Sequence, residues 1–459
     1  MSEPLSPGEP GAVTRILRRI VEVRPDEVRA LLWSCAYFFC ILSAYYILRP
    51  LREEMGVAGG VENLPWLFTG TLVSMLLLHP PFAALVAKLP RLRFVSLTYR
   101  FFMLNLVVFF VLLNLATEAQ NIWIGRVFFV WVSVFNLFIV SVFWAFMADT
   151  YDVEQGKRLF GFIGVGGTLG GILGSTITAS LAQPLGPVNL LLVSVLLLEL
   201  AVLAVRRLAR ISEGWDAPTP LEASGRAAGR GPGVGAKEEP IGGSFLAGIT
   251  HVLRSPYLLG IVVYMLLFTI TATFLYFQQA EIVGATFDDR AARTSFFAKI
   301  DLLVNILNVG TQLFLNGRII KLLGVAVTLA LLPMLVIVGF TGLGLVPTIG
   351  VLAAFQVLRR STNYAVARPT RETLYTVLPR EDKYKAKNFI DTFVYRGGDQ
   401  IGAWSYAAMG WLGLSMVGIA FASVPIAAVW LLVALWLGRR QTGMAAARAR
   451  GAGLATDTA

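Results

Sequence analysis

Three charged residues stand inside an otherwise apolar segment, residues 388–409 of the sequence. They are Asp391, Arg396 and Asp399, and the pair Gly397–Gly398 separates the last two. Charge within a membrane span is costly and commonly marks a transport pathway or a binding site. Arg396 and Asp399 are three residues apart, so they share a helical face and can pair. The pattern favours a fixed cation for an anionic substrate, with the acids as coupling groups or ion-pair partners; a purely structural ion pair is the alternative.

Two adjacent arginines, Arg359 and Arg360, lie near the middle of another apolar segment. Adjacent helical residues point about 100° apart, so both cannot face one cavity equally well. We expect Arg360 to bind substrate, because Asn363 and Tyr364 share its face and offer hydrogen bonds to a phosphate or a base. The alternative, in which one of the arginines holds a neighbouring helix, is equally open.

Further charges lie at the entry or exit of other apolar segments. Lys299 and Asp301 are two residues apart and cannot pair with each other on a regular helix. Asp301 is a candidate acid for proton or cation coupling, or a partner for an arginine of another helix. Arg52 can stand at the outer mouth of a cavity or belong to an interfacial cluster with Glu53. Cations outnumber acids in this set, which predicts an anionic solute.

The elements that must position these residues are membrane spans. The chain has 459 residues, of which 56% are hydrophobic and 15% charged, with a mean hydropathy of +0.68. Apolar runs long enough to span a bilayer recur throughout, so we predict an all-α polytopic membrane protein. The predicted spans are residues 28–48, 64–85, 94–116, 122–147, 159–181, 188–205, 256–278, 294–315, 325–345, 348–367, 388–409 and 412–437.

The distribution of charge between the spans predicts topology. Cationic loops alternate with short or acidic ones, so both termini and the central linker are expected to be cytoplasmic. The net charge of +11 is thereby explained by topology and anionic lipid rather than by nucleic acid. The predicted parts are a segment 1–27 with an interfacial helix or basic tail, a bundle 28–205, a flexible linker with an interfacial helix 206–255, a bundle 256–437 and a disordered tail 438–459.

Charged residues also follow the fourth and tenth spans on the predicted cytoplasmic side. We expect them to form a cytoplasmic gate whose ion pairs break when the transporter opens. They are Asp149, Lys157, Arg158, Arg368, Arg371 and Glu372.

Motifs for other chemistries are missing from the sequence. Cys35 and Cys40 share one apolar run and imply no disulfide framework. The sequence has no zinc-ligand spacing, Walker A motif or nucleophile elbow, so we predict neither an enzyme nor a metal or cofactor site. The N-terminal segment lacks the pattern of a cleaved signal peptide.

The two halves resemble each other. The segments that begin at Phe143 and Asn363 both read as a span, a charged loop with lysine, and a span with a double glycine. Six spans in each half place both loops on the same side, which indicates a parallel repeat with the substrate site between the halves.

Three segments resemble the nucleotide (ATP/ADP) transporter family of plastids and intracellular bacteria, within the major facilitator superfamily. They are YYILRPLREEMG, VFWAFMADTYDVEQGKRLFGFIGVGGTLG and KAKNFIDTFVYRGGDQIGAW. The resemblance is to the divergent bacterial branch, and it implies a fold of two six-helix bundles. It also matches Arg52 and Arg396 to two important lysines of the family. The family's glutamates in the fourth and seventh spans have no match; Asn136 and the segment 278–281 lie nearest.

The sequence therefore predicts an alternating-access transporter for an anionic, phosphorylated solute such as a nucleotide. We expect a monomer in the bacterial inner membrane, with no cofactor. A proton-coupled organic-anion or phospholipid-type carrier that uses Asp301 or Asp399 is one alternative, and a non-transporting membrane scaffold or sensor is another.

Overall fold

The structure is a computed structural model that describes residues 21–212, 255–314, 316–378, 386–387 and 389–456. All regular secondary structure in these ranges is helical. The predicted interfacial helices and most of the predicted linker lie outside the described residues.

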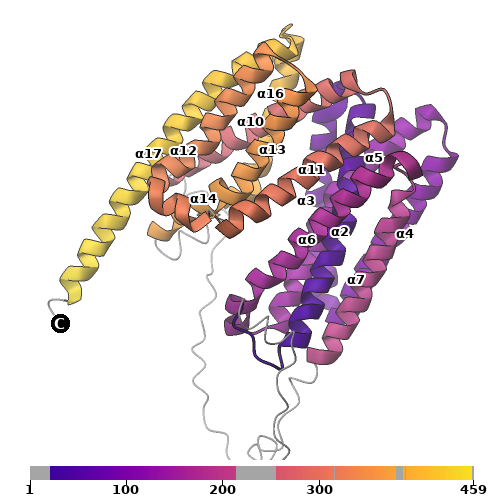
Figure 1. Ribbon diagram of the computed structural model, residues 1–459, viewed down its shortest axis with the longest axis horizontal. Helices are drawn as coiled ribbons and strands as arrows, with labels where there is room; N and C mark the ends of the chain where they lie inside the picture. Colours follow the sequence, from indigo (N-terminus) through magenta and orange to yellow (C-terminus); the bar gives the residue numbers. More distant parts are fainter. Residues whose placement is uncertain (1–20, 213–254, 315, 379–385, 388, 457–459) are drawn as a thin grey trace, which may run out of the picture. The chain divides into compact units, whose positions relative to one another are not determined.

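Helices of the first half follow one another with short connections (Figure 1). They are α2 (Val28–Ala58), η1 (Val61–Asn63), α3 (Leu64–Lys88), α4 (Arg91–Leu115), α5 (Glu118–Thr150), α6 (Val153–Leu185) and α7 (Leu190–Ser212).

The second half is also helical, but two of its spans contain π-helical turns, η2 and η4. The elements are α10 (Pro256–Thr286), α11 (Arg290–Phe314), α12 (Asn316–Leu345), α13 (Ile349–Thr362), η2 (Asn363–Ala367), α14 (Arg368–Leu374), η3 (Tyr375–Val377), η4 (Ile390–Val394), α16 (Tyr395–Trp411) and α17 (Met416–Thr456). Each predicted span thus corresponds to a described helix or to a helix with a π-helical turn. Eight helices in the described residues are long and apolar enough to cross a membrane. The all-α polytopic fold is confirmed.

Several boundaries have local causes in the sequence. A reciprocal capping box between Asp152 and Gln155 starts α6. Ser255 caps α10, whose first residue is a proline that needs no hydrogen-bond partner there. Gly324 adopts a φ of 71° inside α12 and kinks it, which an L side chain would resist.

Three boundaries differ from the predictions. α2 continues to Ala58, ten residues beyond the predicted end of the span at residue 48, so Arg52 is helical. α7 continues to Ser212, into the predicted linker. α17 continues to Thr456, so residues 438–456 are helical, where the sequence predicted a disordered tail. Its alanines and arginines favour helix and extend a helix that is already formed.

The described chain divides into two compact units. The first unit contains residues 21–51, 75–124 and 131–212. The second contains residues 52–74 and 125–130 together with the described residues from 255 onwards. The end of α2, η1 and the start of α3 therefore belong to the second unit, in which η1 contacts α10.

Glycines bring α6 directly onto α2 in the first unit. A Cβ atom at Gly166 or Gly170 would collide with the backbone of Cys35 or Phe39, and one at Gly174 with that of Ser43. Glycines of α16 bring that helix equally close to α10 in the second unit. A Cβ atom at Gly398 would collide with Thr269 of α10, and one at Gly402 with Ile270 and Thr273. Small residues permit this close approach between membrane helices. The double-glycine segments of both halves thus have the same packing role.

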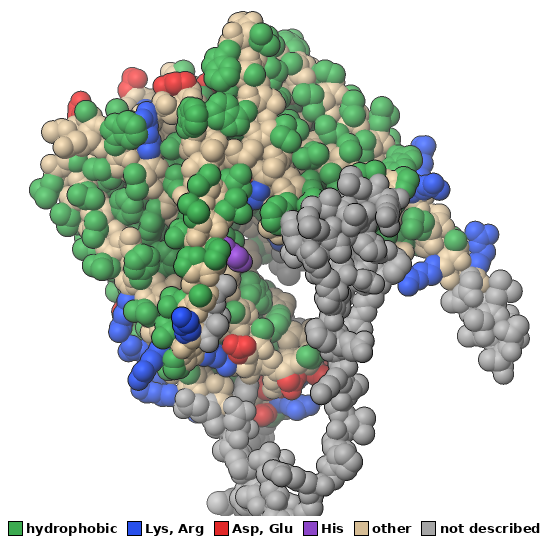
Figure 2. Space-filling model, turned by 180° about the vertical axis from the view of Figure 1, so that it is seen from behind, with side chains coloured by type: hydrophobic (Ala, Val, Ile, Leu, Met, Phe, Trp, Pro, Cys, Tyr) green, Lys and Arg blue, Asp and Glu red, His purple; other side chains and the backbone are tan. Residues whose placement is uncertain are grey.

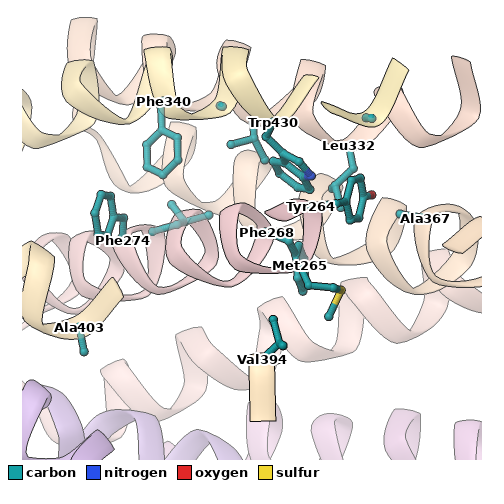
Figure 3. Close-up of a cluster of buried hydrophobic side chains, with 14 of the residues drawn as sticks. Tyr264, Met265, Phe268, Phe274, Leu332, Phe340, Ala367, Val394, Ala403 and Trp430 are labelled. Atoms are coloured by element: carbon teal, nitrogen blue, oxygen red, sulfur yellow. The ribbon is translucent and has the colours of Figure 1, made fainter. Parts of the chain in front are cut away.

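The hydrophobic core of the second unit centres on Trp430 of α17 (Figure 3). Its indole packs against the rings of Tyr264 and Phe268 on α10, with centroid separations of 5.5 and 5.8 Å. Phe340 of α12 belongs to the same cluster. This packing fixes α10, the helix against which α16 lies.

Large hydrophobic side chains also cover the outer surface. Figure 2 shows one face, on which hydrophobic side chains occupy much of the area and charged ones gather in a few places. On α4, Leu97, Phe101 and Leu104 each expose more than half of their surface. Their spacing places them on one helical face, as expected of a helix that faces lipid.

Candidate functional site

Arg396 and Asp399 form an ion pair on α16, as their spacing predicts. Arg396 Nη1 lies 3.6 Å from Asp399 Oδ2, and the two side chains are 40% and 18% exposed. Asp399 interacts electrostatically with Arg52 as well. The ion-pair partner of this carboxylate is thus Arg396, and Arg52 of α2, in the same unit, contributes to its electrostatic surroundings.

The packing of α16 determines where Arg396 points. Gly398 contacts α10, and residues two apart on a helix differ by about 200° in direction. Arg396 consequently lies on the side of α16 opposite α10. Gly397 has no neighbouring atom that a Cβ would meet, so the backbone beside Arg396 is open. The π-helical turn η4 directly precedes this region, and such turns often occur at functional sites.

Arg52 is held on the helical extension of α2. Its guanidinium stacks on the ring of Phe129 at 3.9 Å from the centroid, and its Nε donates to the Phe129 carbonyl at 3.3 Å. Nη1 also donates to Glu53 at 2.9 Å. The side chain is 19% exposed, so Arg52 is more rigidly held and less accessible than Arg396.

The adjacent arginines of α13 take different directions. Arg360 Nη2 lies 2.6 Å from Asp301 Oδ1 of α11, with the side chains 11% and 3% exposed. This buried ion pair agrees with the second of the two predictions for Asp301, in which it binds an arginine of another helix. Lys299 is exposed and does not share the buried position of Asp301. A contact this short between buried groups indicates that Arg360 connects α13 to α11.

Arg359, rather than Arg360, is associated with the α16 region. Tyr395, the first residue of α16, interacts electrostatically with Arg359, Tyr364 and Arg396. Tyr364 is 38% exposed within the π-helical turn η2, whose first residue is Asn363. Binding of a substrate by Asn363, Tyr364 or either arginine stays a prediction.

A polar contact between α3 and α16 has no counterpart in the sequence predictions. Thr69 Oγ1 lies 2.9 Å from Gln400 Oε1 and accepts a hydrogen bond from Trp404 Nε1 at 3.2 Å. Trp66 packs edge-on against Trp404, with ring centroids 4.9 Å apart. Uncharged polar residues are frequent in helices, so only spatial proximity identifies this contact.

A buried carboxylate near the end of α2 was also not predicted. Glu54 is fully buried and accepts hydrogen bonds from Arg290 Nε at 3.0 Å and Nη2 at 3.1 Å. Arg293 Nη2 donates to the same carboxylate at 3.2 Å. The partners are more than 230 residues apart, which explains why local spacing gave no signal.

The predicted gate residues of the first half have partners within the first unit. Asp149 Oδ2 lies 3.8 Å from Arg91 Nε, and Lys157 is exposed. Arg158 Nη2 pairs at 2.9 Å with Glu27, which precedes α2 and is 1% exposed at its side chain. Burial alone would raise the pKa of Glu27, but hydrogen bonds from Arg158, the Arg24 backbone and Gln155 outweigh it, and the pKa lies below its usual value.

The predicted gate residues of the second half differ in burial. Glu372 pairs with Lys387, and Arg368 is exposed. Arg371 is 9% exposed, so it lies inside the helical bundle. Asp391 is exposed and interacts electrostatically with Arg371 and Lys387. The opening of a gate by these residues stays a prediction. Among the described residues, no group of three or more His, Cys, Asp or Glu side chains is placed to bind a metal ion.

Comparison of the sequence with characterised proteins finds carriers of adenine nucleotides. The chain is 25% identical to ADP,ATP carrier protein 1 of Chlamydia trachomatis, over 93% of this chain and 91% of the carrier. It is 23% identical to ADP,ATP carrier protein 1 of Chlamydia pneumoniae, over 90% of each chain. No family model matches the sequence. The resemblance predicted from the three motifs therefore extends over nearly the whole chain.

Solved structures of transporters share the fold. A bacterial homologue of the iron transporter ferroportin superposes with a TM-score of 0.60 at 12% identity, over 90% of this chain and 98% of that one. A bacterial homologue of the lysosomal transporter Spinster gives 0.58 at 12% identity, over 91% and 99%. A nucleoside transporter gives 0.51 at 9% identity, over 90% and 98%. The chain thus has the fold of major facilitator transporters and is a multi-pass membrane transporter.

Proposed function

We propose that the protein exchanges nucleotides of the ATP/ADP type, or closely similar phosphorylated anions, across the bacterial inner membrane. The observation that supports this is the partly exposed ion pair of Arg396 with Asp399 on α16, whose electrostatic surroundings include a second cation, Arg52. A phosphate group can replace the carboxylate as the partner of Arg396, because it offers more acceptor oxygens and more negative charge. The similarity to ADP,ATP carriers favours a nucleotide among the possible anions.

The candidate arginines differ in how readily they could leave their ion pairs to bind a solute, as judged from side-chain exposure and ion-pair distance. Arg396 is the most exposed of the three predicted arginines and has the longest ion pair, whereas Arg360 is nearly buried in a contact of 2.6 Å. Transfer of Arg396 from Asp399 to a solute therefore requires the least rearrangement. Arg52 contributes a second, more rigid cation, and Tyr395 at the start of α16 interacts electrostatically with Tyr364 and Arg359. The alternation of cationic and acidic loops supports a cytoplasmic location for both termini.

The ion pair of Arg396 with Asp399 is compatible with exchange. When phosphate leaves Arg396, Asp399 becomes its counter-ion again, and because the pair is partly exposed, a second phosphorylated solute can displace Asp399 in turn. The similarity to ADP,ATP carriers favours exchange over uncoupled uptake.

The test is uptake of labelled ADP by proteoliposomes that contain the purified protein. We expect uptake only after unlabelled ATP has been loaded inside. Arg396→Gln should reduce the rate at low ADP by roughly 30-fold, because charge-assisted hydrogen bonds contribute about 2 kcal/mol. Arg100→Gln is the matched control, since Arg100 is 50% exposed and belongs to the first unit.

Three results would contradict the proposal. Equal uptake without internal nucleotide would exclude exchange. Uptake that an uncoupler abolishes would favour the proton-coupled carrier, with Asp399 as the acid. The absence of any nucleotide uptake, together with no thermal stabilisation by ADP, would exclude nucleotides as the solute.

A further inference from the structure

A second group of polar side chains is buried among α10, α14 and η3 of the second unit. Arg371 of α14 is 9% exposed, and Tyr264 of α10 and Tyr375 of η3 are 2% and 1% exposed. We call these three residues the Arg371 cluster. Figure 3 shows Tyr264 on α10 beside Met265.

The hydrogen-bonding groups of the cluster are poorly satisfied. Arg371 Nη1 lies 3.0 Å from the Met265 sulfur, which is a weak acceptor. Arg371 Nε and the hydroxyl oxygens of Tyr264 and Tyr375 have no hydrogen-bond partner among the described residues. Arg371 interacts electrostatically with both tyrosines. A buried guanidinium that contacts α10 at Met265, the residue after Tyr264, and two buried hydroxyls therefore lack an adequate acceptor in this part of the second unit.

Neighbouring hydroxyls show that the fold ordinarily supplies acceptors here. Tyr257, two turns before Tyr264 on α10, donates to the Leu374 carbonyl at 2.9 Å. Thr370, next to Arg371, donates to the Val366 carbonyl at 2.7 Å. Buried polar groups are nearly always paired in folded proteins. The Arg371 cluster brings together a cationic group and two hydroxyls that lack such partners among the described residues, and this combination points to a ligand.

The surrounding charges leave room for an anion. Glu372 pairs with Lys387, whose ammonium also lies 5.9 Å from the ring centre of Tyr375. Asp391 interacts electrostatically with Arg371 and Arg368 and is exposed. The three cations Arg371, Lys387 and Arg368 exceed the two acids Glu372 and Asp391 by one charge. Asp391 competes with an incoming anion, but no carboxylate lies within 4.0 Å of Arg371 among the described residues.

We propose that the Arg371 cluster binds a phosphate group. A guanidinium N–H and two phenolic hydroxyls supply several donors to one oxyanion, and the anion supplies the acceptors and negative charge that the cluster lacks. The phosphate is either inorganic phosphate or the terminal phosphate of the transported solute. Only binding of the terminal phosphate of the solute rests on the proposed function. Lys387 and Asp391, which are partly or fully exposed, mark the side from which the anion enters.

The test measures the melting temperature of the purified full-length protein during titration with inorganic phosphate, against chloride at equal ionic strength. We expect saturable stabilisation of the wild type. The double variant Tyr264→Phe/Tyr375→Phe should raise the half-saturating phosphate concentration at least tenfold. It removes only hydroxyls without partners, so it should fold. Tyr257→Phe is the matched control and should keep the phosphate response, because its hydroxyl is already bound.

Other outcomes separate this proposal from the proposed function. Equal phosphate responses in the wild type and the double variant would overturn it, as would a wild type that responds no more to phosphate than to chloride. Arg396→Gln should lose the response to ADP and keep the response to phosphate. A hydroxyl-dependent phosphate response without any ADP response would uphold the cluster and refute nucleotide exchange. If the double variant also weakens the ADP response, the cluster binds the terminal phosphate of the solute.

Discussion

Glu54 provides the sharpest test of the ion pairs described here, because its carboxylate is fully buried and accepts three hydrogen bonds from two arginines. The substitution Glu54→Gln preserves the size of the side chain and one acceptor oxygen but removes the charge. Arg290 and Arg293 then lose their shared counter-ion. Arg293 is the more affected, since it is 12% exposed and Arg290 is 40% exposed.

The burial of Glu54 and Arg293 determines how much stability the substitution Glu54→Gln should remove. Removal of one partner from a buried ion pair costs about 3–5 kcal/mol, and a half-exposed partner recovers part of that by hydration. We therefore expect Glu54→Gln to lower the free energy of unfolding by ~3 kcal/mol. The corresponding fall in melting temperature is roughly 3–6 °C for a chain of this size. The measurement is thermal unfolding of the purified protein in detergent.

An exposed ion pair supplies the control. Asp149 is 61% exposed and lies 3.8 Å from Arg91, so Asp149→Asn should change the melting temperature little. A double-mutant cycle of Glu54→Gln with Arg290→Gln should give a coupling energy above about 1 kcal/mol. Additive losses in the cycle, or a Glu54→Gln protein as stable as the Asp149→Asn protein, would refute the buried ion pair.

Three further predictions concern stability and packing. The lowered pKa of Glu27 means that its stabilising contribution is complete above about pH 4.5 and is lost as the pH falls through the lower folded-state pKa, so thermal scans of Glu27→Gln should show a weaker loss of stability on acidification. Gly170→Leu should abolish the monodisperse peak in size-exclusion chromatography because the side chain would collide with α2, whereas Gly161→Ala, with open space at its Cβ, should be tolerated. Asp301→Asn should lower the melting temperature without changing the half-saturating ADP concentration; a tenfold change in that concentration at unchanged stability would show that Arg360 contacts the solute.

Local spacing predicted those parts of the structure that depend on a single helix. The apolar runs located the spans, because length and composition decide whether a segment can cross a bilayer. The spacing of Arg396 and Asp399 predicted their ion pair. The spacing of Lys299 and Asp301 likewise indicated that they do not pair, and one is exposed while the other is buried.

Contacts between distant segments could not be predicted in this way. The choice between Arg359 and Arg360 depends on the rotation of α13, which packing against α11 sets. The partners of Glu54 lie on α11, far along the chain. The burial of Arg371 depends on how the short helix α14 packs in the second unit, and its charged neighbours in the sequence gave no sign of that burial.

The two halves of the chain share the glycines that pack their helices but not the charged residue beside them. Both halves retain the glycines that bring α6 onto α2 and α16 onto α10. The residue before the double glycine is Arg396 in one half and Val165 in the other, and the two are similarly exposed, at 40% and 48% of the side chain and residue respectively. Packing therefore restrains the glycines in each half, while it leaves the preceding position free to differ. An arginine stands at only one of the two corresponding positions, so the charge that we propose for phosphate binding belongs to the second unit and not to the repeat as a whole.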